Sequence, residues 1–425
     1  MNNYRKRIAD DILQKKLHSK GAVLIEGPKW CGKTTTAEQA AASILYMDEP
    51  SRLRQNLMRA DTDPESLLEG EKPRLIDEWQ LAPKLWDTIR FSVDHARKFG
   101  LYILTGSAVP ASTEEIHHTG TGRFSWLKMR PMSLYESGES SGDVSLAELF
   151  DAADMTVRGF SDLSLKKIAF LICRGGWPMA LDVPDDIALQ QATDYYDAVV
   201  NEDISRVDGV RKDNGYTKRL MRSYARNQGG QVSIDTIAGD LNENEEPDPC
   251  SKTAANYIRT LKKIFVIEDM EAWNPNLRSK TAIRTSDTRY YVDPSIAAAA
   301  LGIGPGDLLD DLETMGLMFE TMAVRDLRVY ADALDASVYH YRDKSGLECD
   351  SVIHRRNGAY GLIEIKLGGD KLIEEGAASL KKLADKIDTD RMKAPSFLMV
   401  LTANGDAAYR RSDGVIVAPI GSLKP

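Results

Sequence analysis

Short apolar runs alternate with amphipathic stretches along the first quarter of the chain. The apolar runs, which predict buried strands, cover residues 22–25, 44–48, 73–78 and 101–107. Before and between them, apolar residues recur at helical spacing over residues 4–18, 35–42, 51–60 and 86–99. Strands that alternate with helices predict an α/β fold in which a parallel sheet carries helices on both faces.

The middle of the chain changes to a mainly helical pattern. A polar, glycine-bearing stretch at 137–142 marks a boundary, and residues 146–228 are mostly helical in pattern. Two further helical patterns, 234–241 and 252–261, precede apolar runs at 264–267 and 289–292 that predict a β-hairpin. Helix, loop, helix and hairpin is the order of a winged helix-turn-helix.

The last part of the chain returns to mixed patterns after a glycine-bearing break at 301–306. Helices are predicted over 315–331 and 373–387, and strands over 337–341, 349–354, 359–366 and 396–401. We therefore expect four domains with the bounds 1–140, 141–228, 229–300 and 306–425.

A glycine-rich turn joins the first predicted strand to its helix. Residues 27–34 match the pattern G-x-x-x-x-G-K-[ST] in the strand–loop–helix context that this pattern requires. Backbone N–H groups in such a loop, and the positive end of the helix dipole, face a phosphate group. Lys33 is expected to reach the β- and γ-phosphates of ATP, and the Thr34 hydroxyl to ligate Mg²⁺. The residues expected to hold the nucleotide are Gly27, Pro28, Lys29, Trp30, Cys31, Gly32, Lys33, Thr34 and Thr35.

Polar residues at the carboxyl ends of the other predicted strands complete this site, because ligands of parallel sheets bind at that edge. Asp77 is suited to hold the Mg²⁺ shell, and Glu78 to orient and deprotonate the attacking water. Ser107 could sense the γ-phosphate or could be a helix cap. Arg123 could act on the nucleotide of a neighbouring subunit or could be a packing arginine.

Composition narrows the class of protein only in part. The 425 residues carry a net charge of −9, which argues against binding nucleic acid through bulk charge but allows a local basic surface. The four cysteines are widely spaced, which disfavours a disulfide framework or a zinc site. The charged first twenty residues do not resemble a secretory signal, and no apolar run approaches transmembrane length. We expect a cytoplasmic protein with no membrane partner.

A second group of charged residues lies in the predicted C-terminal strands. Alternation in a strand places Glu364 and Lys366 on the same face, and a hairpin brings Asp350 beside them. With Glu320 from the preceding helix, these residues could bind Mg²⁺ and stabilise negative charge on a phosphate group. The alternative is a solvated hairpin face.

Several segments together resemble a known family. The segments GPKWCGKT, RLIDEWQLAP, LYILTGSA, GTGRFSWLKMRPMSLYE and RGGWPMAL are similar to a large prokaryotic family of AAA-type ATPases with an uncharacterised C-terminal region. The resemblance covers nearly the whole chain. It implies an AAA-like core, a winged-helix middle region and a C-terminal domain like PD-(D/E)XK nucleases. Trp30 and Cys31 depart from the smaller or basic residues that the family has in the loop, but the ligating glycine and lysine positions are intact.

These observations lead to three functional hypotheses. The first is a Mg²⁺-dependent ATPase that couples nucleotide state to DNA or to a protein partner through its C-terminal half, as a homo-oligomer. Its DNA contacts would include Lys252, Arg259, Lys262 and Lys263, which could instead be an ordinary charged helix face. The second is a nucleotide-switched regulatory protein with little turnover. The third is an ATP-gated endonuclease.

Overall fold

The computed structural model describes residues 4–106, 119–152, 155–206, 210–241, 251–274, 286–390 and 392–425. The chain forms two compact units, each assembled from separate segments. The first unit comprises residues 1–131, 201–212 and 259–266; the second comprises residues 132–200, 213–258 and 267–425. None of the helices in the described residues is long and apolar enough to cross a membrane.

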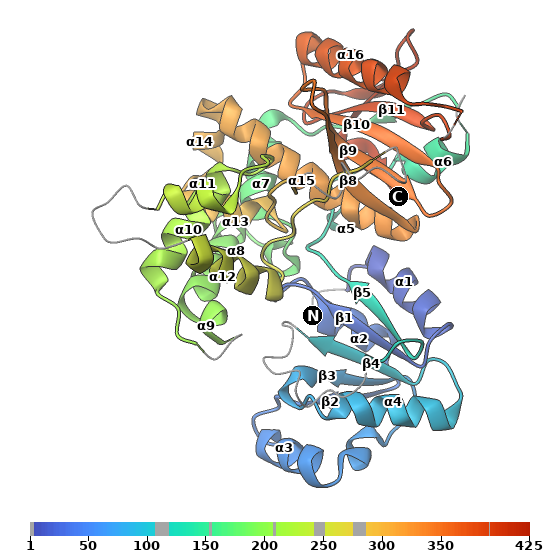
Figure 1. Ribbon diagram of the computed structural model, residues 1–425, viewed down its shortest axis with the longest axis vertical. Coiled ribbons are helices and arrows are strands. Elements are labelled where there is room, and N and C mark those ends of the chain that lie inside the picture. Colours follow the sequence, from blue (N-terminus) through green and yellow to red (C-terminus); the bar gives the residue numbers. More distant parts are fainter. Residues whose placement is uncertain are drawn as a thin grey trace. The chain divides into compact units, whose positions relative to one another are not determined.

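A five-stranded parallel sheet forms the centre of the first unit (Figure 1). Its order is β2-β3-β4-β1-β5, with bounds Ser43–Tyr46, Arg74–Asp77, Tyr102–Gly106, Ala22–Glu26 and Phe124–Lys128. Four of these strands coincide with the predicted apolar runs. The edge strand β5 was not predicted, because its polar and exposed positions interrupt the apolar pattern.

Helices pack on both faces of this sheet, as the sequence predicts. On one face, α1 (Ile8–Leu17) and α2 (Lys33–Ala40) form a core with the odd-numbered strand residues Val23 and Ile25. On the other face, α3 (Leu53–Thr62) and α4 (Leu85–Ala96) form a core with Ala22 and Leu24. The alternation of side chains along β1 thus supplies both cores. The predicted α/β fold class is confirmed.

The second unit begins with a helical region (Figure 1). Its helices, in chain order, are α5 (Leu134–Ser137), α6 (Leu146–Asp151), α7 (Leu165–Arg174), α8 (Asp185–Ala198), α10 (Asn214–Arg226), α11 (Ile234–Gly239), α13 (Pro294–Leu301) and α14 (Pro305–Asp310). Helix α12 (Ser251–Lys263) begins in this unit, and its residues from 259 onward belong to the first unit. The short α9 (Ile204–Arg206) belongs to the segment that returns to the first unit. Helix α13 was not predicted; Asp293 caps it by accepting from the Ser295 N–H at 3.0 Å.

The segment predicted as a winged helix contains two helices followed by two short antiparallel contacts. Isolated bridges join Ile267 to Tyr291 and Met270 to Thr288. Helix α12 extends to Lys263, two residues beyond the predicted end, so Ile264 follows the helix directly. Residues 275–285, which would form the tip of the wing, lie outside the described residues. The winged-helix assignment stays a prediction.

A seven-stranded mixed sheet completes the second unit. Its order is β7-β12-β13-β11-β10-β9-β8, with bounds Gly159–Phe160, Ala407–Arg410, Ile416–Pro419, Phe397–Thr402, Tyr360–Lys366, Glu348–Arg355 and Ala336–Arg342. Helix α16 (Asp370–Lys386) packs through Leu380 and Leu383 on a core that includes Val352 and Leu362. Helix α15 (Leu312–Ala333) contacts strands β8, β9 and β10. Strands β12 and β13 were not predicted. Strand β7, from a distant part of the chain, pairs with β12.

Candidate nucleotide site and charged clusters

The phosphate loop of the first unit depends on two glycines. Gly27 follows β1, and a Cβ there would lie 2.1 Å from the Met129 carbonyl oxygen, which leaves no room for a side chain. Gly32 has a left-handed backbone conformation, with φ of 97°, and is the N-cap of α2. The loop therefore brings the N-terminus of α2 to the carboxyl edge of the sheet, where it can face an anion.

Three predicted residues meet at this edge. The Lys33 Nζ donates to the carbonyl oxygens of Gly27 at 2.9 Å and Pro28 at 2.7 Å, so the ammonium lies inside the loop. The Thr34 hydroxyl donates to Asp77 Oδ1 at 2.8 Å, and Thr105 of β4 donates to the same oxygen. Burial raises the pKa of the Asp77 carboxyl, and these two hydrogen bonds oppose the rise.

This arrangement fits Mg²⁺ bound with a nucleotide. Mg²⁺ commonly takes one or two oxygen ligands from the protein and the rest from phosphates and water. The hydroxyl of Thr34 and the carboxylate of Asp77 are hard oxygen ligands that are already in contact beside the loop. They would hold the ion, and Lys33 would contact the phosphates.

Glu78 follows Asp77 at the end of β3 and has a left-handed backbone, with φ of 53°. The Gln80 side-chain amide donates to the Glu78 carboxylate. Gln80 was not predicted as part of the site; its position after two acids gives no signal in the sequence. The water-activating role of Glu78 stays a prediction.

The other two predicted catalytic residues are Ser107 and Arg123. Ser107 lies outside the described residues. Arg123 immediately precedes β5, and Phe124 is in register with Ala22 at the start of β1. Arg123 is therefore at the amino edge of the sheet, about 13 Å of strand from the phosphate loop. Its Nε donates to Asp94 Oδ1 of α4 at 2.7 Å. A role for Arg123 on a neighbouring subunit stays a prediction.

Two long-range contacts to the phosphate loop were not predicted. The buried guanidinium of Arg7 donates to the carbonyl oxygens of Cys31 at 2.7 Å and Arg130 at 2.9 Å. The Lys29 Nζ contacts Asp203 Oδ1 at 2.5 Å. Arg7 thus fixes the backbone of the loop from one side, and Asp203 holds one of its side chains.

The C-terminal charged residues of the second unit also come together. The Lys366 Nζ lies 3.1 Å from Asp350 Oδ2 and 2.6 Å from Glu364 Oε2, so the ammonium bridges the two carboxylates. Burial raises the pKa of Glu364 to about 8, and the charge of Asp350 adds to the rise. The described residues include no group of three or more His, Cys, Asp or Glu side chains that could hold a metal ion. Mg²⁺ binding at this cluster stays a prediction.

Glu320 of α15 completes this cluster, as predicted from the sequence. Burial raises its pKa to about 8, and the charge of Asp350 contributes further. The buried Tyr290 hydroxyl donates to Glu320, a contact that the sequence did not indicate. The cluster therefore combines one lysine with three acidic side chains, and burial favours the protonated forms of Glu320 and Glu364.

A consequence for stability follows from Glu320. The folded protein keeps a proton that the unfolded chain releases above its ordinary pKa, so this stabilisation is complete at acidic pH and is lost as pH rises through about 8. Glu320→Gln keeps the acceptor for Tyr290 without the charge. The free energy of unfolding of the variant, minus that of wild type, is expected to rise by at least about 1.4 kcal/mol from pH 5 to pH 9, the equivalent of one pKa unit.

Urea unfolding in EDTA at both pH values measures this difference. Glu375→Gln, an exposed site on α16, is the control, and parallel profiles for Glu320→Gln and wild type would contradict the expectation.

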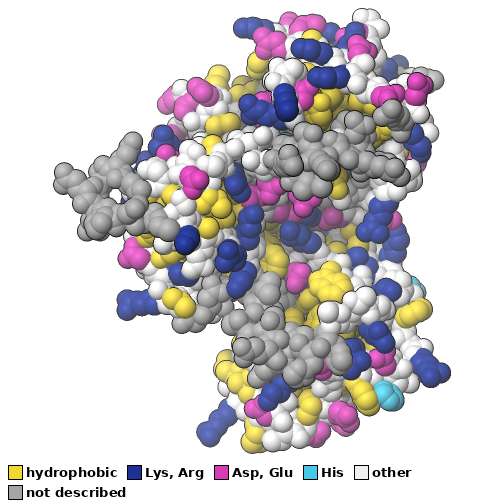
Figure 2. Space-filling model, in the orientation of Figure 1, with side chains coloured by type: hydrophobic (Ala, Val, Ile, Leu, Met, Phe, Trp, Pro, Cys, Tyr) yellow, Lys and Arg dark blue, Asp and Glu magenta, His cyan; other side chains and the backbone are white. Residues whose placement is uncertain are grey.

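Helix α10 carries a basic face that was not predicted from the sequence. Its exposed residues include four cations within an arc of roughly 100°, given 3.6 residues per turn, and the helix has no acidic residue. Within the described part of the chain, no ion pair involves these four residues, Lys218, Arg219, Arg222 and Arg226. Figure 2 shows Lys and Arg side chains over the surface where Figure 1 labels α8, α10 and α12. Of the residues predicted on α12, Lys252, Arg259 and Lys262 are exposed and Lys263 is half-buried.

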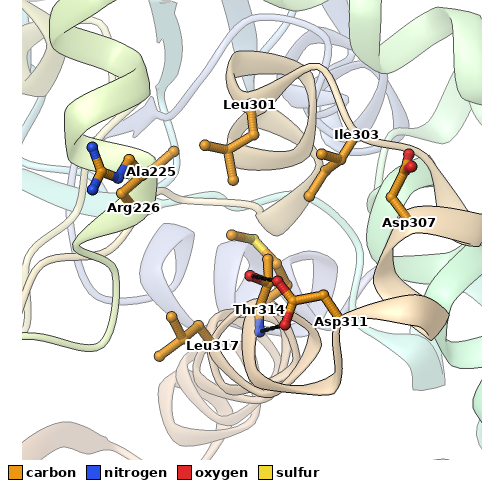
Figure 3. A pocket seen from close by; sticks show the side chains of 9 residues that line it. Ala225, Arg226, Leu301, Ile303, Asp307, Asp311, Thr314 and Leu317 are labelled. Atoms are coloured by element: carbon orange, nitrogen blue, oxygen red, sulfur yellow. Dashed lines mark hydrogen bonds between the residues drawn. The ribbon is translucent and has the colours of Figure 1, made fainter.

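One of these cations lines a pocket of about 350 Å³ in the second unit (Figure 3). Arg226 lies across the pocket from Asp307 and Asp311, and the remaining lining is mainly apolar. Both carboxylates cap helices: Asp307 accepts from the Gly304 N–H at 2.8 Å, and Asp311 accepts from the Thr314 N–H at 3.1 Å. The acids therefore have structural partners, whereas Arg226 remains available to an anion.

The fold and the loop define the first unit as a P-loop nucleotide-binding domain of the α/β class. Residues 19–138 match the family model described as an AAA domain, which supports an ATPase-type function for this part of the chain. Residues 165–307 and 315–423 match two further models, each described as a domain of unknown function (DUF8612 and DUF4143).

Two relatives match most of the chain. The uncharacterized proteins Mb2031c of Mycobacterium bovis and Rv2008c of Mycobacterium tuberculosis are each 23% identical to this chain over 365 residues, which are 85% of this chain and 74% of theirs. Among solved structures, the Walker-type ATPase PABY2304 of Pyrococcus abyssi is 13% identical, covers 69% of this chain and 94% of its own, and gives a TM-score of 0.39. At this TM-score the likeness does not establish a shared fold.

Proposed function

We propose that the first unit binds and hydrolyses ATP with Mg²⁺. The observation that carries this proposal is the contact of Thr34 with Asp77 beside a loop that already encloses the Lys33 ammonium. Phosphoryl transfer requires a hydroxyl and a carboxylate that hold Mg²⁺ and a lysine that binds the phosphates. These three groups lie together at the edge of the parallel sheet.

Each residue has a distinct role in this proposal. Bound Mg²⁺ would neutralise charge that develops on the β- and γ-phosphates. Lys33 binds these phosphates, and the backbone N–H groups of the loop orient them. Glu78 orients a water molecule and accepts its proton as the water oxygen bonds to the γ-phosphorus. The bond from that phosphorus to the β–γ bridging oxygen breaks in the same reaction, and ADP leaves. Arg7 holds the loop in position through the Cys31 carbonyl.

We further propose that the second unit couples this ATPase to nucleic acid. The support is the basic face of α10, which is without acidic partners among the described residues and can replace counterions on a phosphate backbone. The exposed face of α10 has no large apolar residue, which disfavours insertion into a membrane surface. Because the net charge of the chain is negative, nucleic acid would be bound at the local basic face of α10 and not through attraction to the protein as a whole.

ATP turnover with and without duplex and single-stranded DNA tests this coupling. We expect DNA to stimulate turnover in wild type, and we expect the stimulation to be lost when the four α10 cations are changed to Gln. The slope of log affinity against log salt should fall by about 0.9 for each phosphate contact removed from duplex DNA. The control variant has four lysines of α16 changed to Gln and therefore loses the same charge: Lys371, Lys381, Lys382 and Lys386. Three of these lysines, Lys371, Lys381 and Lys386, form ion pairs.

Two alternatives have different outcomes in the same assay. Slow turnover that is indifferent to DNA would favour a nucleotide-switched protein that acts on a protein partner or through self-association. Cutting of plasmid DNA by wild type, and not by Asp350→Ala, would favour the endonuclease. In this structure the Lys366 ammonium lies between Asp350 and Glu364, the two carboxylates on which that activity would depend.

A further inference from the structure

Asp203 reaches the phosphate loop from far along the chain. It ends a π-helical turn, Val199–Asp203, that follows α8, and it lies in the segment 201–212 that returns to the first unit. It is outside residues 19–138, which match the AAA model. Its Oδ1 contacts the Lys29 Nζ at 2.5 Å, and the Asp203 side chain is only 10% exposed. π-helical turns are rare and frequently occur at functional sites.

The charges at this contact oppose phosphate binding. Lys29 is the third residue of a loop that curves around a phosphate group, so its four-carbon side chain can reach the terminal phosphate. In the present arrangement, Asp203 neutralises this ammonium and places its own negative charge beside the loop. A bound polyphosphate would compete with Asp203 for Lys29 and would repel the carboxylate.

We propose that Asp203 is a positioning residue of the nucleotide site, which holds Lys29 when no phosphate is bound and yields it to the γ-phosphate of ATP. This inference rests on the proposed binding of ATP by the loop. Because only a triphosphate supplies the terminal phosphate, competition from Asp203 for Lys29 lowers the affinity for ATP more than the affinity for ADP. Release of Lys29 also frees the segment that connects to α8, so the nucleotide state reaches residues beyond the AAA-matched part of the chain.

The affinities of Asp203→Asn and wild type for a non-hydrolysable ATP analogue and for ADP, each with Mg²⁺, test the proposal. Asparagine keeps the size of the side chain and removes the competing charge. We expect the variant to bind the ATP analogue about tenfold more tightly, in the usual range of coupling between two interactions, with a smaller gain for ADP. The gain should shrink at high salt, because the Lys29 side chain is 41% exposed and the interaction is screened.

The neighbouring residue supplies a matched control. Glu202 lies in the same turn, but it pairs with Arg206 at 2.5 Å and not with the loop. Glu202→Gln should leave both affinities unchanged. In the background of Lys29→Ala, Asp203→Asn should no longer improve binding, since the two residues act as one pair. Equal affinities of wild type and Asp203→Asn, or an equal gain in the Lys29→Ala background, would overturn the proposal.

Hydrogen exchange in the wild-type protein tests the role of Asp203 without any substitution, so the result does not depend on whether a variant folds. Amides of residues 199–206 should exchange faster with the ATP analogue than with ADP, and unchanged exchange would overturn the proposal. The variant Lys33→Ala distinguishes failure of the proposed ATP binding from failure of the proposed role of Asp203. If wild type and Lys33→Ala bind the analogue equally, the proposed function fails and the role of Asp203 fails with it. If only wild type binds and Asp203→Asn has no effect, only the role of Asp203 fails.

Discussion

Replacing Glu78 with Gln is expected to lower ATP turnover by about 10²–10⁴-fold while binding of ATP is retained. The amide can still take part in hydrogen bonds at the end of β3, but it cannot accept a proton from the attacking water. Lys33 and Thr34 bind the phosphates and the metal independently of this step. Steady-state phosphate release and equilibrium binding of a fluorescent ATP analogue measure the two quantities separately.

Two control variants show what no effect and complete loss of the nucleotide site look like in the same two assays. Glu71→Gln changes an exposed carboxylate in the loop before β3 and should leave turnover and binding unchanged. Lys33→Ala should lose binding as well as turnover. Unchanged turnover in Glu78→Gln would assign water activation to another group, and loss of binding would show that Glu78 supports the loop.

Replacing Arg325 with Met is expected to destabilise the protein by about 3–5 kcal/mol. Arg325 of α15 is 1% exposed and lies between two buried carboxylates, at 2.9 Å from Asp293 and 2.7 Å from Asp326. Those carboxylates accept from the backbone N–H groups of Gly176, which lies two residues after the end of α7, and Leu134, the first residue of α5. Without Arg325, two negative charges remain buried and unneutralised. Burial raises the pKa of Asp326 to about 6 even with Arg325 present, so the penalty should be smaller at pH 5 than at pH 8.

Arg342→Met is the matched control for this ion pair. Arg342 is also an arginine of the second unit in an ion pair, at 3.0 Å from Glu348, but its side chain is 49% exposed. Exposed pairs of this kind contribute about 0–1 kcal/mol. Urea unfolding of the two variants at pH 8 compares them directly. A loss below about 1 kcal/mol for Arg325→Met would mean that the cluster relaxes or admits water.

The sequence was most informative where the interactions are local. The phosphate loop, its flanking strand and helix, and the placement of Asp77 depend on a continuous segment or on the ends of neighbouring parallel strands. The same holds for Asp350, Glu364 and Lys366, because strand alternation and one hairpin bring them together. These parts of the fold and of the sites could be predicted from residue patterns alone.

Two of the contacts that were missed depend on residues far apart in the chain. Arg7 and Asp203 carry no spacing signal, since each reaches the phosphate loop through tertiary folding. Gln80 lies only two residues from Glu78, but its residue type does not indicate the contact. The position of Arg123 could not be predicted without β5, whose register places this residue at the amino edge. Strands β12 and β13 were missed because each has only four residues, although the two strands are neighbours in the chain and pair with each other.

The pairing of β7 with β12 has a consequence for biosynthesis. Phe160 is in register with Ala407, so one partner of this pair leaves the ribosome long before the other. At roughly 5–20 residues per second, synthesis of the intervening chain takes on the order of 10–50 s. During that interval the residues around Phe160 are without their strand partner, and a chaperone could bind them. The mixed sheet can be completed only after residue 419 has emerged, whereas all five strands of the parallel sheet are available once residue 128 has been made.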